Sequence, residues 1–214
     1  PVSSLAEVLC QHHVFNHVRS SRRATWRSPT RTADGVYYRV TALDGFLKDH
    51  RVMEQETIPG AAWIEAILRE VGTPAHLSDL VFMRPFTLNG HPCVDVTVSR
   101  KNGRVSVTAA DKERSKLCSA QISEHNPETQ QPERLQDFAR TYDHYIDAHE
   151  CLATLKKGGA DYGPLYQIAA GCWYSDDELL LHVRLPHGAY SAQGAPIPMI
   201  DSLFQGIVLF EMVS

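Results

Sequence analysis

Two polar residues that could exchange protons stand beside strongly apolar runs. His50 precedes the run "PGAAWIEAIL" that starts at Pro59, and Asp201 lies inside the run "PIPMIDSLFQGIVLFEMVS". An imidazole can accept a proton and a carboxylic acid can donate one, so the pair could act as general base and general acid. Apolar neighbours would favour the neutral form of Asp201, whereas the start of a helix would favour its carboxylate. The sequence therefore leaves the protonation of Asp201 open.

The two apolar runs are predicted to be helices that position these side chains. Pro59 suits the first turn of a helix, and the apolar residues after it recur at helical spacing. Asp201 and Gln205 are four residues apart, so they share one helix face and the amide can hold the carboxyl in one orientation. Gln205 has apolar neighbours, where a purely structural role would favour an apolar side chain. We therefore expect Gln205 to orient the carboxyl group of Asp201.

Alternating segments around the helices predict antiparallel strands. In the first half these are "GVYYRVTAL", "HPCVDVTVSR", "RVSVTAA" and "LCSAQIS", with a tight hairpin at Asn102-Gly103. In the second half, the alternation runs from Tyr166 to Tyr174, turns at residues 175–177 and returns through residues 179–185. A helix followed by an antiparallel meander predicts a sheet curled around that helix, which is the hot-dog arrangement.

The repeated plan predicts an internal duplication. Residues 1–125 form the first half, residues 126–140 are a Pro-, Gln- and Glu-rich linker, and residues 141–214 form the second half. No sequence follows Ser214 to wrap the second helix, so we expect a second half that is truncated at its C-terminus. Its missing strands would come from a longer polypeptide or from a partner.

Composition excludes several classes of function. The 214 residues carry a net charge of -4, which favours neither nucleic acid nor an anionic membrane. No run is long enough to span a membrane and Pro1 starts no signal peptide, so the cytoplasm is expected. The five scattered cysteines predict reduced thiols. His12, His13 and His17 could suggest a metal site, but no acidic or cysteine ligand accompanies them, and no metal is expected.

Three motifs, in family order, resemble the signatures of polyketide synthase dehydratase domains. The matching residues are His50, Pro59 and Gly60 in the first motif; Gly159, Tyr162, Gly163 and Pro164 in the second; and Asp201 and Gln205 in the third. The resemblance implies an α+β double hot-dog fold with one active site between the two halves.

The resemblance also implies the reaction, which is removal of water from a β-hydroxyacyl thioester. His50 would be the base, Asp201 the acid and Gln205 the residue that orients the acid. Backbone N–H groups near Gly60 would meet the thioester carbonyl, and Tyr162 would donate a hydrogen bond in the site. Pro59, Gly159, Gly163 and Pro164 are expected to be structural.

The substrate would arrive on an acyl carrier protein, whose phosphopantetheine arm belongs to that partner, so the domain itself needs no cofactor. Neighbouring polyketide synthase domains are further expected partners, and the sequence leaves a homodimer open. A basic cluster could attract an acidic carrier protein or simply be a solvated face. It comprises Arg19, Arg22, Arg23, Arg27 and Arg31.

Two positions depart from the family pattern. Glu54 stands where the first motif has glycine, and a backbone with positive φ there would be strained. Tyr166 stands where phenylalanine is frequent. Two alternatives remain open: a pyran-forming cyclase or double-bond-shifting isomerase with the same fold, and a non-catalytic or split structural domain. The acid at Asp201 argues against a cyclase or isomerase that does not dehydrate, although a domain with both dehydratase and cyclase activity stays open. The presence of both His50 and Asp201 argues against a non-catalytic domain, whereas the end of the sequence at Ser214 keeps the split domain open.

Overall fold

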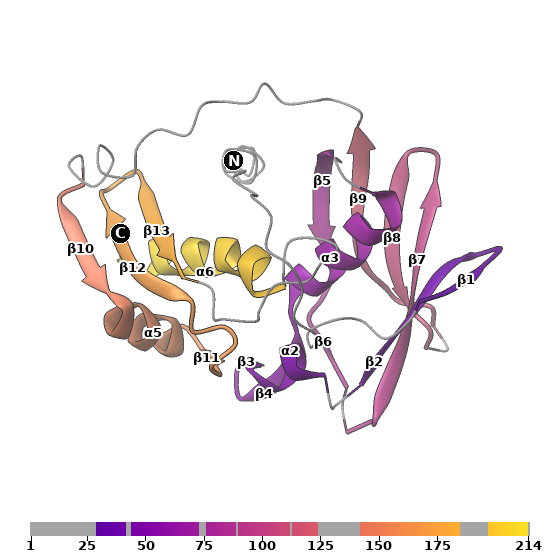
Figure 1. Cartoon of the computed structure of the whole chain (residues 1–214), viewed down its shortest axis with the longest axis horizontal. Coiled ribbons are helices and arrows are strands. Elements are labelled where there is room, and N and C mark those ends of the chain that lie inside the picture. The colour runs from indigo at the N-terminus through magenta and orange to yellow at the C-terminus, as the bar shows by residue number, and fades with distance from the viewer. Residues whose placement is uncertain are drawn as a thin grey trace.

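The computed structural model describes residues 29–41, 44–72, 76–88, 90–111, 113–123, 142–184 and 197–213. A larger body with a six-stranded sheet and a smaller body with a three-stranded sheet lie side by side, joined by a small four-stranded sheet (Figure 1). The predicted linker, residues 126–140, lies outside the described residues. The same holds for the N-terminal segment, which contains His12, His13, His17 and the first four arginines of the basic cluster.

The larger body wraps an antiparallel sheet around helix α3, Gly60–Val71. Valines alternate along its central strands, so Val96, Val98, Val105 and Val107 are all fully buried in the core. The strands, in sheet order, are β1 (Thr30–Thr32), β2 (Gly35–Thr41), β7 (Cys93–Lys101), β8 (Arg104–Ala109), β9 (Lys116–Ser123) and β5 (His76–Phe82).

The smaller body packs its sheet against helices α5, Ala148–Lys157, and α6, Ile197–Val213. Helix α5 begins with a capping box, in which the Asp147 side chain accepts from the Glu150 N–H and Glu150 accepts from the Asp147 N–H. The strands, in sheet order, are β10 (His144–Asp147), β12 (Ala169–Tyr174) and β13 (Leu179–Val183).

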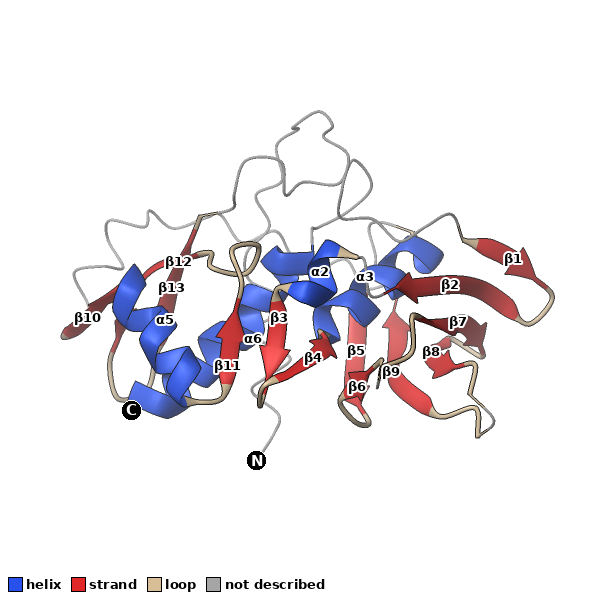
Figure 2. Cartoon of the chain, turned by 90° about the horizontal axis from the view of Figure 1, so that it is seen from below, coloured by secondary structure: helices blue, strands red, loops and turns tan. Residues whose placement is uncertain are grey.

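A small sheet connects the two bodies (Figure 2). Strand β11 of the second half pairs antiparallel with β3 of the first half, which places Tyr162 opposite His50. Helix α6 also bridges the bodies, because Ile200 near its start packs in the larger core and Leu209 packs in the smaller one. The elements are α2 (Gly45–Lys48), β3 (His50–Val52), β4 (Gln55–Ile58), β6 (Phe86–Thr87) and β11 (Ala160–Tyr162).

Most of the predicted elements are present, with one correction. The helix after Pro59, the helix around Asp201 and the strands of both halves are found, and β7 turns into β8 at Asn102-Gly103 with φ of 52° and 74°. The predicted strand from Tyr166 was wrong at its start, because it begins only at Ala169. Tyr166 lies in a turn instead, and its hydroxyl donates to the Phe46 carbonyl at 2.8 Å. In the described part of the chain, no helix is long and apolar enough to cross a membrane.

Candidate active site

His50 is held on β3 in one tautomer. Its Nδ1 lies 2.7 Å from the backbone carbonyl oxygen of Thr57, on the neighbouring strand β4. A carbonyl oxygen can only accept, so Nδ1 carries the proton and Nε2 is left with a free lone pair. The ring is therefore set up as a base at Nε2.

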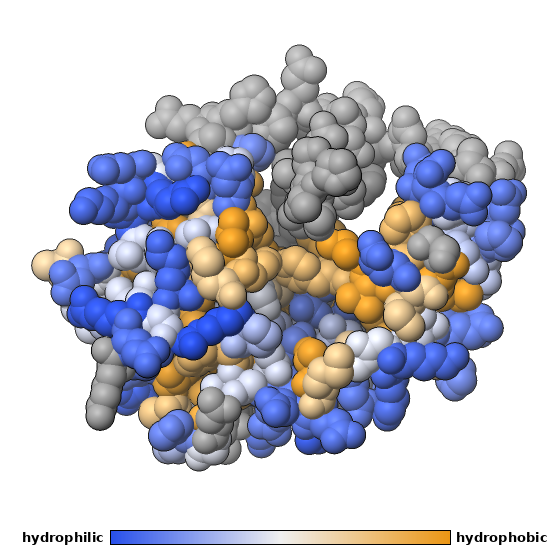
Figure 3. Space-filling model, turned by 180° about the vertical axis from the view of Figure 1, so that it is seen from behind, coloured by the Kyte–Doolittle hydropathy of each residue, from blue (hydrophilic) through white to orange (hydrophobic). Residues whose placement is uncertain are grey.

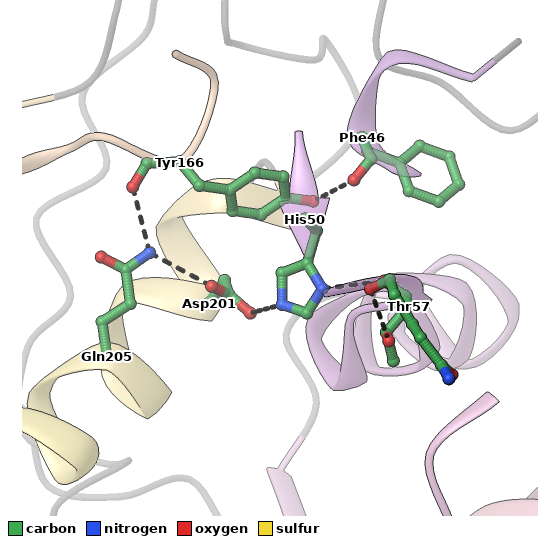
Figure 4. A network of polar contacts seen from close by, with 7 residues as sticks. Phe46, His50, Thr57, Tyr166, Asp201 and Gln205 are labelled. Carbon is green, nitrogen blue, oxygen red and sulfur yellow. Dashed lines mark hydrogen bonds and ion pairs between the residues drawn. The ribbon is translucent and has the colours of Figure 1, made fainter. Parts of the chain in front are cut away.

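Asp201 faces that lone pair from the second half of the chain. Its Oδ1 lies 3.6 Å from His50 Nε2, and the two side chains are only 3% and 7% exposed (Figure 4). The separation exceeds a good hydrogen bond. The two groups thus share one buried site, at a distance that lets both reach adjacent atoms of a third molecule.

Gln205 fixes which oxygen of Asp201 is available. Its Nε2 donates both to the Tyr166 carbonyl and to Asp201 Oδ2, each at 3.2 Å. Because the Tyr166 carbonyl only accepts, this network assigns the amide nitrogen, and Oδ2 must be an acceptor. When Asp201 is protonated, its proton therefore sits on Oδ1, which faces His50.

Two tyrosines surround the His50 ring. The ring centroids of Tyr162 and Tyr166 lie 5.3 and 5.2 Å from that of His50. Burial, and then the negative charge of Asp201, raise the pKa of both phenols well above the ordinary value. Both therefore stay neutral and can serve only as hydrogen-bond groups or apolar surface.

The turn after Tyr162 is anchored by Asp49, a residue that the sequence analysis missed. The Asp49 backbone carbonyl accepts from the Gly163 N–H at 2.7 Å, and its carboxylate accepts from the Leu165 N–H at 2.8 Å. A Cβ on Gly163 would lie 2.5 Å from that carboxyl group, so glycine is required there. The only signal in the sequence was an acid next to His50.

The other motif residues lie at turns and helix starts. Pro59 is the N-cap of α3 and Gly60 its first residue, directly after the strand that carries Thr57. A Cβ on Gly60 would lie 3.0 Å from the Phe82 ring. Gly159 has φ of +89°, and a Cβ there would meet the Met53 sulfur at 2.7 Å, whereas Pro164 is exposed.

Glu54 occupies a left-handed turn between β3 and β4. Met53 and Glu54 have φ of 48° and 65°, the conformation that favours glycine or asparagine in a two-residue hairpin. The strain that was expected for Glu54 is therefore built into the hairpin that carries His50 and Thr57.

No group of three metal-ligating side chains occurs among the described residues.

The first half of the chain, residues 27–112, matches a family model described as polyketide synthase dehydratase domain. Two curated proteins are similar in sequence. Polyketide synthase PksM of Bacillus subtilis (strain 168) is 27% identical over 173 residues, which are 68% of this chain and 4% of that protein. The spectinabilin polyketide synthase system protein NorA of Streptomyces orinoci is 29% identical over 161 residues, which are 69% of this chain and 8% of that protein.

Solved structures share the fold. The dehydratase domain from the CurJ module of curacin polyketide synthase is similar with a TM-score of 0.73 and 18% identity, over 90% of this chain and 74% of that one. A trans-AT polyketide synthase dehydratase domain from Brevibacillus brevis gives a TM-score of 0.72 and 19% identity, over 88% and 74% of the two chains. The α+β double hot-dog fold expected from the sequence is confirmed.

Proposed function

We propose that this chain, which is related to polyketide synthase dehydratase domains in sequence and shares their fold, converts a β-hydroxyacyl thioester to the α,β-enoyl thioester. The substrate would be carried on the phosphopantetheine of an acyl carrier protein, and the domain would bind no cofactor of its own. One observation carries the proposal: a base lone pair on His50 and an acid oxygen on Asp201 face each other across a buried 3.6 Å gap.

His50 removes the proton from the α-carbon of the substrate. The electrons of that C–H bond form the new double bond as the bond between the β-carbon and the hydroxyl oxygen breaks. Asp201 delivers the proton on Oδ1 to the departing hydroxyl, so that water leaves. His50 then holds one extra proton and Asp201 has lost one. Transfer of a proton from His50 to Asp201 restores the starting state.

The surroundings of His50 and Asp201 support these roles. The Thr57 carbonyl, which accepts from Nδ1 at 2.7 Å, stabilises the imidazolium that forms during proton removal. Gln205 leaves Oδ1 as the oxygen that carries the transferred proton. Backbone N–H groups at the start of α3, around Gly60, are proposed to stabilise the negative charge on the thioester oxygen.

Tyr162 and the partner proteins complete the proposal. Tyr162 keeps its phenol proton and is proposed to donate a hydrogen bond to the substrate. The relatives are polyketide synthases, so neighbouring synthase domains are proposed partners alongside the carrier protein.

The products formed from a panel of β-hydroxyacyl carrier-protein thioesters test this function. Mass spectrometry should show that the product has lost one water molecule. An unchanged mass with a new ring or a shifted alkene would indicate a cyclase or an isomerase instead. Unaltered substrate across the panel would indicate a non-catalytic domain and overturn the proposal.

A further inference from the structure

An aromatic pair links the two halves of the chain next to the acid. Phe82, at the end of β5, makes an edge-to-face contact with Phe204 of α6, with ring centroids 5.5 Å apart and an interplanar angle of 80°. Phe204 lies three residues after Asp201, so the two side chains are neighbours on the helix surface. Figure 3 shows one face of the molecule, on which apolar surface gathers toward the middle.

A β-bulge aims Phe82 at this position. Ser78 pairs with Gln121 and Val81 with Ser119, so β5 contains one residue more than β9 across this stretch. Asp79 takes a positive φ of 48° there. The extra residue reverses the alternation of side chains, which places Phe82 on the same face of β5 as Leu77, whose side chain packs against the larger core. Bulges of this kind often re-aim a side chain beside an active site.

Phe82 also covers the start of α3. Its ring lies against Gly60, where an added Cβ would be only 3.0 Å away. Phe82 is nevertheless 38% exposed, so part of its side chain remains accessible and is not buried in the core. The pair therefore reaches from the proposed thioester-oxygen site at Gly60 to the helix that carries the acid.

We propose that Phe82 and Phe204 form a specificity-determining wall beside the α-carbon of the substrate. The inference rests on the dehydration proposed above, in which Gly60 meets the thioester oxygen and Asp201 meets the β-hydroxyl. The α-carbon lies between those two groups in the substrate, so the wall runs along it. Two aromatic rings beside that carbon disfavour a methyl branch on it, so the preferred substrates are β-hydroxyacyl thioesters without an α-methyl group.

The test compares kcat/KM for a 3-hydroxyacyl and a 2-methyl-3-hydroxyacyl carrier-protein thioester, with both configurations at the α-carbon supplied. The wild type should favour the unbranched substrate. Phe82→Ala should reduce that preference by about tenfold, because one methyl group in an apolar pocket is worth on the order of 10- to 200-fold. Phe82→Leu, which keeps a smaller apolar side chain at this position, should give an intermediate ratio.

Met83→Ala is the matched control. Met83 is the next residue and is 46% exposed, so its loss should leave the ratio unchanged. Melting temperatures verify that each variant is folded. An unchanged ratio in folded Phe82→Leu and Phe82→Ala would overturn the wall but leave the dehydration intact. A wild type that prefers the 2-methyl substrate would also overturn the wall and leave the dehydration intact. A wild type that dehydrates neither substrate would overturn both proposals.

Discussion

Replacing Glu54 by glycine should stabilise the protein without changing its reaction. Glu54 is exposed at the tip of the β3–β4 hairpin with φ of 65°, and its side chain makes no hydrogen bond or ion pair among the described residues. The one interaction of this residue with Arg51 uses the backbone carbonyl, which glycine retains. The substitution therefore removes strain and little else.

The size of the effect follows from two opposing terms. A non-glycine residue in the left-handed region costs roughly 1–2 kcal/mol. Glycine makes the unfolded chain more flexible, which costs roughly 0.4–1 kcal/mol in the other direction. The free energy of unfolding should therefore rise by about 0.5–1 kcal/mol for Glu54→Gly, and the melting temperature should rise by about 1–4 °C for a chain of this length.

Urea unfolding monitored by circular dichroism measures the change, provided that the m-value is the same for each variant. Glu56→Gly is the control, because Glu56 is an exposed strand residue of the same hairpin and has no positive φ. Glycine there should lower the free energy of unfolding by about 0.5–1 kcal/mol. If both substitutions destabilise the protein equally, the left-handed strain at Glu54 does not exist.

Three further results are expected. Asp201→Asn should impair dehydration more than Gln205→Ala, since asparagine cannot deliver a proton whereas loss of the amide only frees the acid to turn; the reverse order in single-turnover rates would refute these roles. Asp49→Ala should leave the Leu165 N–H unpaired, which lowers the free energy of unfolding by about 1–3 kcal/mol in urea titrations, and an unchanged stability would argue against the anchor. The free energy of unfolding should decrease as the pH rises above the ordinary thiol pKa of 9.0, because the folded state keeps protons that the unfolded thiols release. A urea midpoint that is no lower at about pH 10 than at about pH 8 would contradict this. Burial raises the pKa of Cys151 to about 11 and those of Cys118 and Cys172 to about 12.

Elements with local signals could be predicted from the sequence. Helix α3 has an apolar face after a proline, and the hairpin at Asn102-Gly103 has the residues that its positive φ values require. The capping box of α5, from Asp147 to Glu150, also has a local signal, namely an acid followed three residues later by glutamate. Local chemistry therefore accounts for much of the secondary structure.

The site depends on pairings that no local pattern encodes. Strands β3 and β11 are three residues each, and they bring His50 opposite Tyr162 only through a contact between the two halves. The facing of His50 and Asp201 followed from motif resemblance, because neither residue specifies the other by spacing. Asp49 and the bulge beside Phe82 were missed, since their roles appear only when a turn and a neighbouring strand are in place.

The single-turnover rate of dehydration by His50→Ala tests the central claim most directly. The substrate is a carrier-protein thioester that the wild type converts, and circular dichroism establishes that the variant is folded. Removal of the base should slow water loss by at least about 10²-fold, the lower end of what a general base contributes. A folded His50→Ala protein that loses water from the substrate at close to the wild-type rate would show that His50 is not the base and would contradict the account.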